Sequence, residues 1–239
     1  MVRRALLLAV LCLVAAQTQA PAANYFVGPN GSDTFGDGSM GNPWFTLPKA
    51  GGDGMRWLLP GDTVYALPGN YAYGGPQAIR YMGGTAVNPI TYKAYNGPGT
   101  VFMNFSNTDN FGFDVGGSGT YAPNYLVFDG LNISGASAPL YLHDCVGIEV
   151  KNCVITTSNW AWKMLVLRTT SDMFIHNNYL ETGYGNQRAI GIDWGGKDIV
   201  VANNVIARSE TAFDVDTTSA GDEYWGSIGF FNNIVTEAT

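Results

Sequence analysis

Val201-Ala202-Asn203-Asn204-Val205-Ile206 is one of five stretches in which a short apolar phrase, two small or polar residues and a second apolar phrase follow one another. The other four copies span residues 128–133, 150–155, 175–180 and 230–235. Gly130, Asn152, Asn177, Asn203 and Asn232 are equivalent, and the copies are 22, 25, 26 and 29 residues apart. Strand-like phrases with a period in the twenties predict a β-solenoid, in which each repeat is one coil stacked on the next.

The asparagines in this pattern indicate how the chain bends between strands. A tight bend needs a residue that tolerates the left-handed backbone region, and glycine and asparagine do so at the lowest cost. Stacked asparagines can also hydrogen-bond amide to amide from one coil to the next. We therefore expect a bend at each of these positions.

Composition and charge narrow the functional classes. The chain of 239 residues has 12 Lys and Arg, 19 Asp and Glu and a net charge of −7. It has no basic stripe, so we expect no nucleic-acid partner. With few charges and many glycines, it fits a β-rich secreted domain.

The first 22 residues predict a signal peptide. Arg3-Arg4 precede an apolar run from Ala5 to Ala16, and Ala20-Pro21-Ala22 is a small-x-small cleavage site. The run is too short for a comfortable membrane span. Its removal leaves a charge of 10 − 19 = −9. We therefore predict a secreted protein whose mature part has no membrane span.

Cys145 and Cys153 remain in the mature chain, because Cys12 leaves with the signal peptide. In an exported protein the two could form a disulfide. Cys153 occupies the place that Leu131 has one coil earlier, which favours two small buried fillers.

Residues 23–239 are predicted to form one domain, with N-terminal coils and a cap at 24–103 and regular coils at 104–239. Strands are expected at 24–27, 63–67 and 89–95, and a short helix at 44–50, although the glycines at 51–54 weaken it. The last repeat phrase ends four residues before Thr239. Since solenoids need a polar cap, we expect that the chain is a piece of a longer one; a naturally short helix is the alternative.

The N-terminal part contains, in this order, the stretches 25–33, 42–47, 61–65, 88–92 and 94–97. These stretches and their order resemble the opening of proteins of the pectin-lyase-like superfamily of secreted right-handed parallel β-helix proteins. The resemblance implies a right-handed parallel β-helix, an all-β fold, over nearly the whole mature chain. It also implies relationship to polysaccharide lyases of the pectate, alginate and chondroitin type. The same opening occurs on proteins with other activities, so the activity stays open.

A second strand about ten residues before each bend predicts aligned columns of side chains. These strands span residues 140–143, 165–168, 190–193 and 213–216. Strand alternation sends every second residue outward, and coils stack about 4.8 Å apart. One outward column then holds Tyr141, Val166, Gly191 and Asp214, and the neighbouring column holds His143, Arg168, Asp193 and Asp216. Asp114 is expected on the same face.

Asp193, Asp214 and Asp216 are candidate ligands of Ca²⁺, because adjacent carboxylates repel one another without a cation and calcium prefers oxygen ligands. The resemblance to lyases implies that a cation neutralises a uronate carboxylate while a base removes the C5 proton. Candidate bases are Arg168, Lys197, Lys163 and His143. The alternative for the acidic cluster is a solvated face or a structural calcium. Arg168 could likewise be merely the counter-ion of Asp193. His176, beside Asn177, is interpreted as structural.

Candidate sugar-contact residues are Tyr141, Arg188, Trp194 and Trp225. Further aromatic platforms are expected in loops or strand ends at Trp160, Trp162, Tyr184 and Tyr224, with Asn186 and Gln187 as polar neighbours. Loop aromatics that pack on their own coil are equally common. The long stretch from Asp216 to Trp225 is a place where a solenoid builds a site.

We therefore predict a monomeric, extracellular, carbohydrate-active β-helix that binds an acidic polysaccharide. Calcium-assisted β-elimination is the activity to test. The alternative is a non-catalytic cell-surface or matrix module that uses its strands as a binding scaffold.

Overall fold

The structure, a computed structural model, describes residues 21–51, 58–106, 111–117, 122–157, 162–183, 187–216 and 225–236. Apart from residues 21 and 22, the predicted signal peptide lies outside this range, so it stays a prediction. None of the described residues belongs to a helix with the length and apolar character to cross a membrane.

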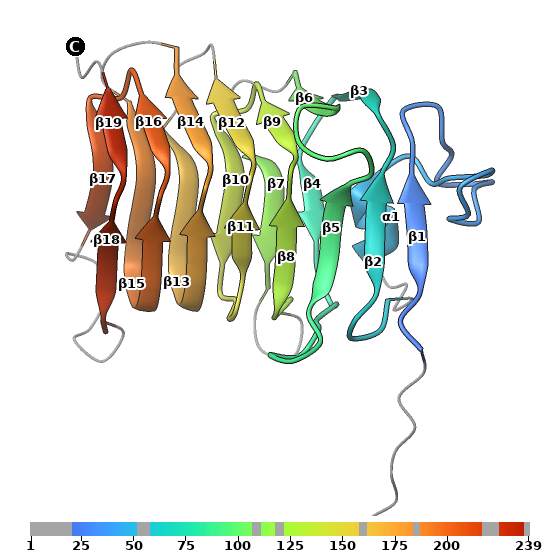
Figure 1. Cartoon of the computed structure of the whole chain (residues 1–239), viewed down its shortest axis with the longest axis horizontal. Coiled ribbons are helices and arrows are strands. Elements are labelled where there is room, and N and C mark those ends of the chain that lie inside the picture. Colours follow the sequence, from blue (N-terminus) through green and yellow to red (C-terminus); the bar gives the residue numbers. More distant parts are fainter. Residues whose placement is uncertain are drawn as a thin grey trace, which may run out of the picture.

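The described chain winds into a parallel β-solenoid whose coils stack along one axis (Figure 1). The predicted parallel β-helix is therefore confirmed. Every pairing between the named strands is parallel, and the described strands form a 12-stranded and a 7-stranded sheet. The larger sheet folds round a corner into two walls, and the smaller sheet is the third.

Wall 1 consists of β4 (Gln77–Ile79), β7 (Phe111–Gly116), β10 (Ala138–His143), the first parts of β13 (Lys163–His176) and β15 (Arg188–Ala202), and β17 (Thr211–Asp216). Wall 2 consists of β1 (Asn24–Val27), β2 (Thr63–Ala66), β5 (Ile90–Ala94), β8 (Leu126–Asp129), β11 (Glu149–Lys151), the second parts of β13 and β15, and β18 (Ile228–Phe231). Wall 3 consists of β3 (Gly69–Tyr73), β6 (Val101–Phe105), β9 (Asn132–Ser134), β12 (Val154–Thr157), β14 (Tyr179–Thr182), β16 (Val205–Ala207) and β19 (Ile234–Thr236).

The predicted bends lie between walls 2 and 3. Asn152, Asn177, Asn203 and Asn232 have φ angles between 50° and 56°, and Gly130 has a φ of 77°. All five residues are thus in the left-handed region, as expected from their types.

An asparagine ladder follows these bends, and the second asparagine of each pair forms it. The Asn178 side-chain amide donates to Asn204 Oδ1 at 3.0 Å, and the Asn204 amide donates to Asn233 Oδ1 at 3.0 Å. Asn178 also accepts from the backbone N–H of Cys153 at 2.9 Å.

Cys153 and Cys145 are both buried and free, and burial raises the pKa of the Cys153 thiol to about 12. The interpretation as buried fillers is confirmed.

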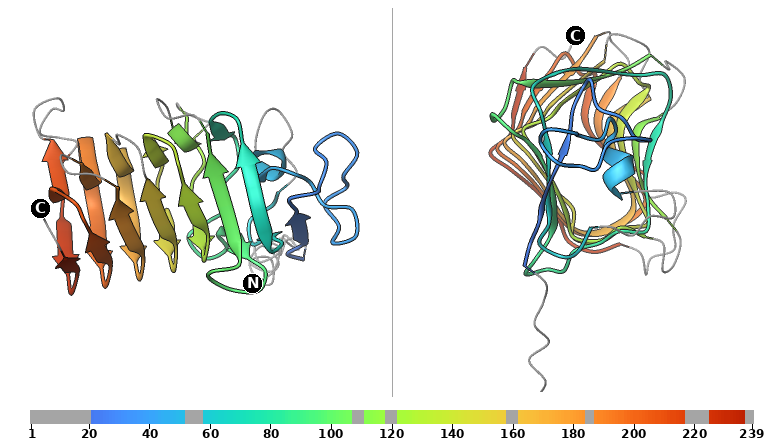
Figure 2. Two further views of the ribbon diagram at one scale, coloured as in Figure 1. Left: turned by 90° about the horizontal axis from the view of Figure 1, so that it is seen from above. Right: turned by 90° about the vertical axis from the view of Figure 1, so that its right-hand side faces the viewer.

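The only described helix, α1 (Leu47–Gly51), lies across the N-terminal end of the stack and overlaps the predicted helix at 44–50 (Figure 2). Leu47 is fully buried against the interior core. The short helix therefore covers apolar side chains that the first coil would otherwise expose.

Candidate functional site

The outer face of wall 1 carries both predicted columns in the predicted register. Along β10, β13, β15 and β17, Tyr141 pairs with Val166, Val166 with Gly191 and Gly191 with Asp214. In the same way the second column joins His143, Arg168, Asp193 and Asp216. Asp114 pairs with Tyr141, so it extends the first column as expected.

Part of this outer face is apolar and buried. Tyr141 and Val166 form a small cluster with Ala138, separate from the interior core, and Phe111 packs against it. The Phe111 and Tyr141 rings stack with centroids 4.2 Å apart. Since Phe111 covers one face of its ring and Tyr141 is only 6% exposed, Tyr141 offers its hydroxyl rather than a free ring face.

Lys163 fills the space between two of the predicted metal ligands. Its ammonium group contacts Asp193 Oδ1 and lies 2.9 Å from Asp214 Oδ2. The side chains of Lys163 and Asp193 are 2% and 3% exposed. Arg188 reaches the same oxygen of Asp214 at 3.2 Å, with its own side chain half exposed. Two cations and two carboxylates thus neutralise one another in a mostly buried cluster.

Gly191 makes room for this arrangement. A Cβ added at Gly191 would overlap the aliphatic stem of Lys163. The stem crosses the outer face of β15 at Gly191 to reach both carboxylates, so any larger residue there would displace it. The glycine in the first column therefore has a steric role.

A half-buried Arg168 and an exposed Trp194 form the solvent-facing part of the site. The Arg168 guanidinium lies over the Trp194 ring, 3.9 Å from its centroid, and Arg168 Nη1 donates to Tyr141 Oη at 3.1 Å. Trp194 is 48% exposed and has a φ of 58° at the corner between walls 1 and 2. Stacking and the hydrogen bond hold the guanidinium in one orientation, which is a suitable geometry for binding a carboxylate.

His143 lies between two carboxylates. Its Nε2 is 3.0 Å from Asp114 Oδ1, its Nδ1 is 2.9 Å from Asp144 Oδ2, and Arg80 pairs with Asp114 from the other side. Burial alone would lower the pKa of His143, but the hydrogen bonds to Asp114 and Asp144 outweigh it and raise the pKa. For Asp114, burial alone would raise the pKa of the carboxyl group. The contacts with His143 and Arg80 outweigh burial, so the pKa of Asp114 is lowered. Both ring nitrogens of His143 are therefore engaged.

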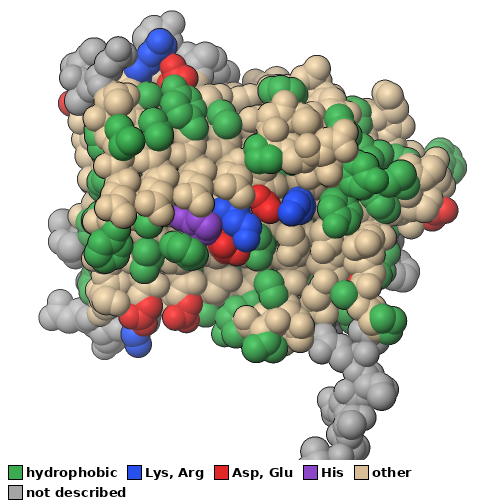
Figure 3. Space-filling view, in the orientation of Figure 1, with side chains coloured by type: hydrophobic (Ala, Val, Ile, Leu, Met, Phe, Trp, Pro, Cys, Tyr) green, Lys and Arg blue, Asp and Glu red, His purple; other side chains and the backbone are tan. Residues whose placement is uncertain are grey.

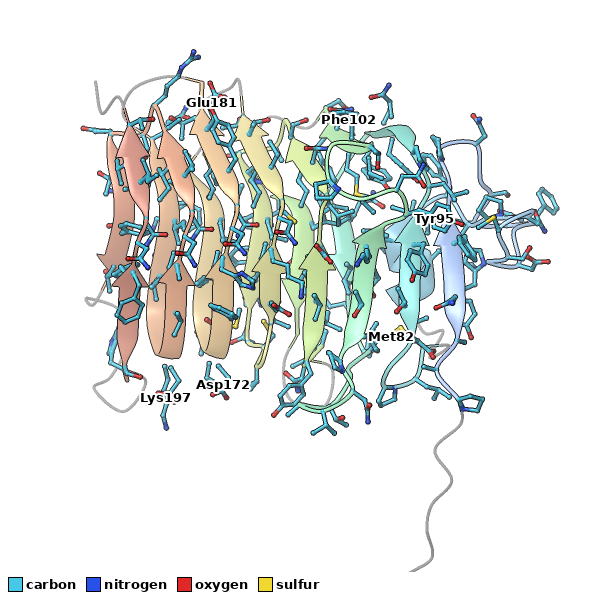
Figure 4. All side chains as sticks on the ribbon, in the orientation of Figure 1. Met82, Tyr95, Phe102, Asp172, Glu181 and Lys197 are labelled. Atoms are coloured by element: carbon cyan, nitrogen blue, oxygen red, sulfur yellow. The ribbon has the colours of Figure 1, made fainter. Side chains whose placement is uncertain are left out.

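Lys197 and Trp225 lie beyond the corner, on the side of wall 2. Lys197 pairs with Ser171, is exposed and points away from the stack at its lower edge in Figure 4. It contributes to a shallow cavity of about 200 Å³ at the corner, whose other lining residues are Asp144, Cys145, Val146, Thr169, Thr170 and Ser171. Trp225 forms a bridge with Gly196 and packs against the interior core. These two residues are therefore separated from Arg168 by the corner.

The predicted calcium ligands do not form a free carboxylate group in this arrangement. Asp193 and Asp214 both contact Lys163, and among the described residues no three His, Cys, Asp or Glu side chains come together as a metal site would require. Asp216 is in register with Asp193 at the end of β17. The residues as placed do not fit a bridging Ca²⁺, and calcium binding stays a prediction.

Several of the predicted sugar platforms, Trp160, Tyr184 and Tyr224, lie outside the described residues, as does Asn186. Trp162 is 47% exposed, and its ring lies 4.8 Å from the Lys163 ammonium. Gln187 is buried. His176 contacts Glu149 at 2.8 Å and Asn177 at 3.0 Å, in agreement with its structural interpretation.

The sequence reasoning missed Arg80 and the pairing of Lys163 with the two aspartates. Arg80 follows β4, in a coil where the repeat is not visible, so no pattern placed it beside Asp114. For Lys163 a signal existed: an outward glycine between charged neighbours leaves space for a long side chain from the adjacent strand.

No family model and no curated protein sequence matches the chain. Among solved structures, it is similar to the pectate lyase Pel9A, with a TM-score of 0.56 and 17% identity over 88% of this chain and 62% of that protein. It also aligns with a rhamnogalacturonan lyase, with a TM-score of 0.47 and 16% identity over 90% of this chain and 51% of that one. The chain thus spans less than two thirds of the length of either lyase. The similarity to Pel9A shows a shared β-solenoid fold.

Proposed function

We propose that the outer face of wall 1 binds an acidic polysaccharide, with Arg168 and Trp194 at the centre of the site. The observation that carries the proposal is the stacked pair itself, a fixed guanidinium over a half-exposed indole. An indole face suits the apolar face of a sugar ring, and a guanidinium fork suits a uronate carboxylate. The fold shared with a pectate lyase supports a carbohydrate ligand.

The charges around the pair favour an acidic ligand. The protein carries a net charge of −7, so a polyanion needs local cations to approach it. Arg188 is half exposed and, with Lys163, already compensates Asp214. Arg168, in contrast, contacts a tyrosine hydroxyl and an indole, and none of the described carboxylates forms an ion pair with it. The interpretation of Arg168 as a counter-ion of Asp193 is therefore less favoured than ligand binding, since Lys163 pairs with Asp193.

β-Elimination is the chemistry that we propose for an enzymatic form of this site. A base removes the C5 proton of a uronate, the C5–H electron pair forms the C4–C5 double bond, and the bond from C4 to the 4-linked oxygen breaks. The leaving oxygen takes a proton from water, and the base later returns its proton to water. Of the candidate bases, Arg168 is the one left on the open face, because Lys163 is buried between carboxylates, His143 is engaged at both ring nitrogens, and Lys197 lies beyond the corner. As a base Arg168 acts in its neutral form, so in an enzymatic form of the site the half-exposed Arg188 binds the uronate carboxylate instead.

A non-catalytic binding module is the second candidate. It is favoured by the same ion pairs, which occupy Asp193 and Asp214 and leave no group of acidic ligands for a metal among the described residues. Both candidates share the polysaccharide ligand and, following the predicted signal peptide, an extracellular location.

Binding is tested first, by isothermal titration of the full chain with polygalacturonate, alginate and chondroitin. We expect at least one polymer to bind, and Arg168→Gln and Trp194→Asn each to weaken it about tenfold or more. Asparagine tolerates the left-handed backbone at position 194. Arg208→Gln is the matched control, because Arg208 is an exposed arginine that precedes β17 and pairs with Glu181 of wall 3, whereas Arg168 stacks on Trp194 at the opposite end of the wall 1 strands. No binding by the wild type, or equal affinities for Arg168→Gln and the control, would overturn the proposal.

Activity is measured on the bound polymer as ultraviolet absorbance from the unsaturated product, with added Ca²⁺ and with chelator. Product formation that Arg168→Gln abolishes supports the lyase. Binding without product under either condition supports the non-catalytic module. Loss of product with chelator, together with calorimetric binding of Ca²⁺ that Asp216→Asn weakens, would support the predicted calcium.

A further inference from the structure

An aromatic cluster covers the outer face of wall 2 near the N-terminal end, away from the wall 1 site. Phe26 of β1 pairs in register with Tyr65 of β2, and Tyr65 pairs with Lys93 of β5. Tyr95 follows β5, and Figure 4 shows it against β2 on this face. Figure 3 shows the face itself, with a hydrophobic patch beside a lysine or arginine and an acidic side chain.

The three rings contact one another. Phe26 and Tyr65 stack with centroids 5.7 Å apart, and Tyr95 meets Phe26 and Tyr65 edge-on at 5.8 and 5.5 Å. Tyr95 is 43% exposed, and the other two are half-buried. Each ring thus comes from a different coil, and coils lie about 4.8 Å apart. The cluster extends along the axis of the stack.

None of the three rings belongs to either buried hydrophobic cluster of the described residues. The interior of these coils is filled by residues of the opposite strand parity, such as Val64 and Tyr92. The cluster is therefore additional to the core.

Short polar side chains run beside the rings. Asn24, Thr63 and Thr91 pair in register on the same face, two residues before Phe26, Tyr65 and Lys93 respectively, and all three are exposed or half-buried. Lys93 pairs with Asp129 at 3.3 Å, so these two charges compensate one another. The face thus offers a compact cluster of three rings, a neighbouring row of hydroxyl and amide groups, and little net charge.

We propose that Phe26, Tyr65 and Tyr95 form a second carbohydrate-binding platform, which holds a polysaccharide chain running along the stack. Tyr95, the most exposed of the three rings, packs against the apolar C–H groups of a pyranose, and Phe26 and Tyr65, which stack on one another, add their outward edges. The sugar hydroxyls reach Asn24, Thr63 and Thr91. Because Lys93 and Asp129 neutralise each other, ring stacking supplies the affinity and the platform accepts uncharged chains as well as acidic ones. The platform rests on the proposed function only in that both surfaces bind carbohydrate.

The test uses the full chain in affinity electrophoresis and calorimetry with neutral arabinoxylan and with polygalacturonate, at low salt and at about 0.5 M NaCl. Salt screens exposed charges, so it weakens binding through Arg168 and leaves ring stacking largely unchanged. We expect Tyr65→Ala/Tyr95→Ala to weaken the salt-resistant binding about tenfold or more, and Arg168→Gln to weaken only the salt-sensitive binding. Phe102→Ala is the matched control, since Phe102 is an aromatic of wall 3 with 42% exposure. Tyr95→Ala alone serves if the double variant does not fold.

The outcomes separate the two proposals. The platform is overturned if the wild type shows no salt-resistant binding, or if Tyr65→Ala/Tyr95→Ala keeps that binding. In either case the effect of Arg168→Gln on the salt-sensitive binding still decides the wall 1 site. Loss in the double variant with no effect of Arg168→Gln supports the platform and overturns the wall 1 site. A concentration-dependent dimer that the double variant abolishes, without a change in polysaccharide affinity, assigns the rings to a second copy of the chain and overturns the platform.

Discussion

Two groups of buried polar side chains lie on the same solenoid, and they are satisfied in different ways. In the asparagine ladder each member bonds to an identical residue one coil away, as Asn178, Asn204 and Asn233 do. In the Lys163 cluster of wall 1, an ammonium from β13 contacts carboxylates from β15 and β17. The ladder repeats with the fold, whereas the cluster occurs at one place only among the described coils.

This difference indicates that the asparagine ladder has a structural role and that the Lys163 cluster belongs to the candidate functional site. Identical stacked partners stabilise each coil of the ladder in the same way and give none of these coils a distinct chemistry. Unlike partners on successive coils create a local arrangement of charges, and the exposed Arg168–Trp194 pair adjoins it. The loss of unfolding free energy on substitution should therefore differ between the Lys163 cluster and the asparagine ladder.

Lys163→Met should have the largest effect. It removes the ion-pair partner of Asp193 and leaves that buried carboxylate without an opposite charge among the residues that the structure describes. Breaking a buried ion pair on one side costs about 3–5 kcal/mol of unfolding free energy. Chemical denaturation monitored by circular dichroism measures this loss.

Lys151→Met is the matched control, because Lys151 pairs with Glu149 on a side chain that is 28% exposed. An exposed pair of this kind contributes about 0–1 kcal/mol. The double variant Lys163→Met/Asp193→Asn should recover part of the loss, since it removes the unpaired charge. Equal losses for Lys163→Met and Lys151→Met would show that the cluster is not buried as described.

Asn204→Ala should have the next largest effect, through the ladder. Asn204 accepts from the Asn178 backbone and side chain and donates to Asn233 Oδ1 and to the Ile175 carbonyl. Its loss leaves buried groups unsatisfied, at about 1–3 kcal/mol. The control is Asn203→Gly at the preceding position, where the side chain is exposed and φ is 56°. Glycine adopts that backbone freely, so its unfolding free energy should change little, and a loss equal to that of Asn204→Ala would contradict the division of roles.

The sequence was sufficient for the parts of the fold that repeat. The bends at Asn152, Asn177, Asn203 and Asn232 were predicted because few residues tolerate their backbone. The columns of wall 1 were also correct, because strand alternation and coil stacking leave no other register once the bends are aligned. The register of the strands in successive coils can therefore be predicted from the sequence repeat alone.

The chemistry of wall 1 was less accessible, because partners in unlike positions do not follow the repeat. Alternation predicted an exposed Asp193, yet Lys163 reaches across Gly191 to bury it. Arg80 reaches Asp114 from a coil whose repeat is not visible in the sequence. Long side chains such as these pair with whichever charged group lies within reach in the folded structure. Aligning the strands into columns does not show which group that is.

The contacts of His143 with Asp114 and Asp144 should make a smaller contribution to the unfolding free energy, and this contribution should depend on pH. The pKa of His143 is raised in the fold, so its stabilisation is complete below the unfolded value of about 6.5 and is lost as pH rises through the folded pKa. The pKa of Asp114 is lowered, so its contribution is present above its usual value and is lost as pH falls through the folded pKa. Denaturation midpoints of wild type and His143→Gln should therefore differ most below about pH 6.5 and converge at alkaline pH. A difference that grows toward alkaline pH would contradict the contacts with Asp114 and Asp144.

Tyr92→Phe should have the smallest effect, and it tests the comparison from the opposite side. Tyr92 is fully buried in the interior and stacks on Phe128 at 5.3 Å, and its hydroxyl has no hydrogen-bond partner among the described residues. Unlike the amides of the ladder, this oxygen was removed from water without compensation. Phenylalanine keeps the ring and omits the unsatisfied group, so the unfolding free energy should stay equal or rise by about 1 kcal/mol. Tyr71→Phe is the control, because the Tyr71 hydroxyl donates to the Leu67 carbonyl at 2.7 Å, and its loss should lower stability. A larger loss at position 92 than at position 71 would mean that the Tyr92 hydroxyl is satisfied after all, by a group that lies outside the described contacts.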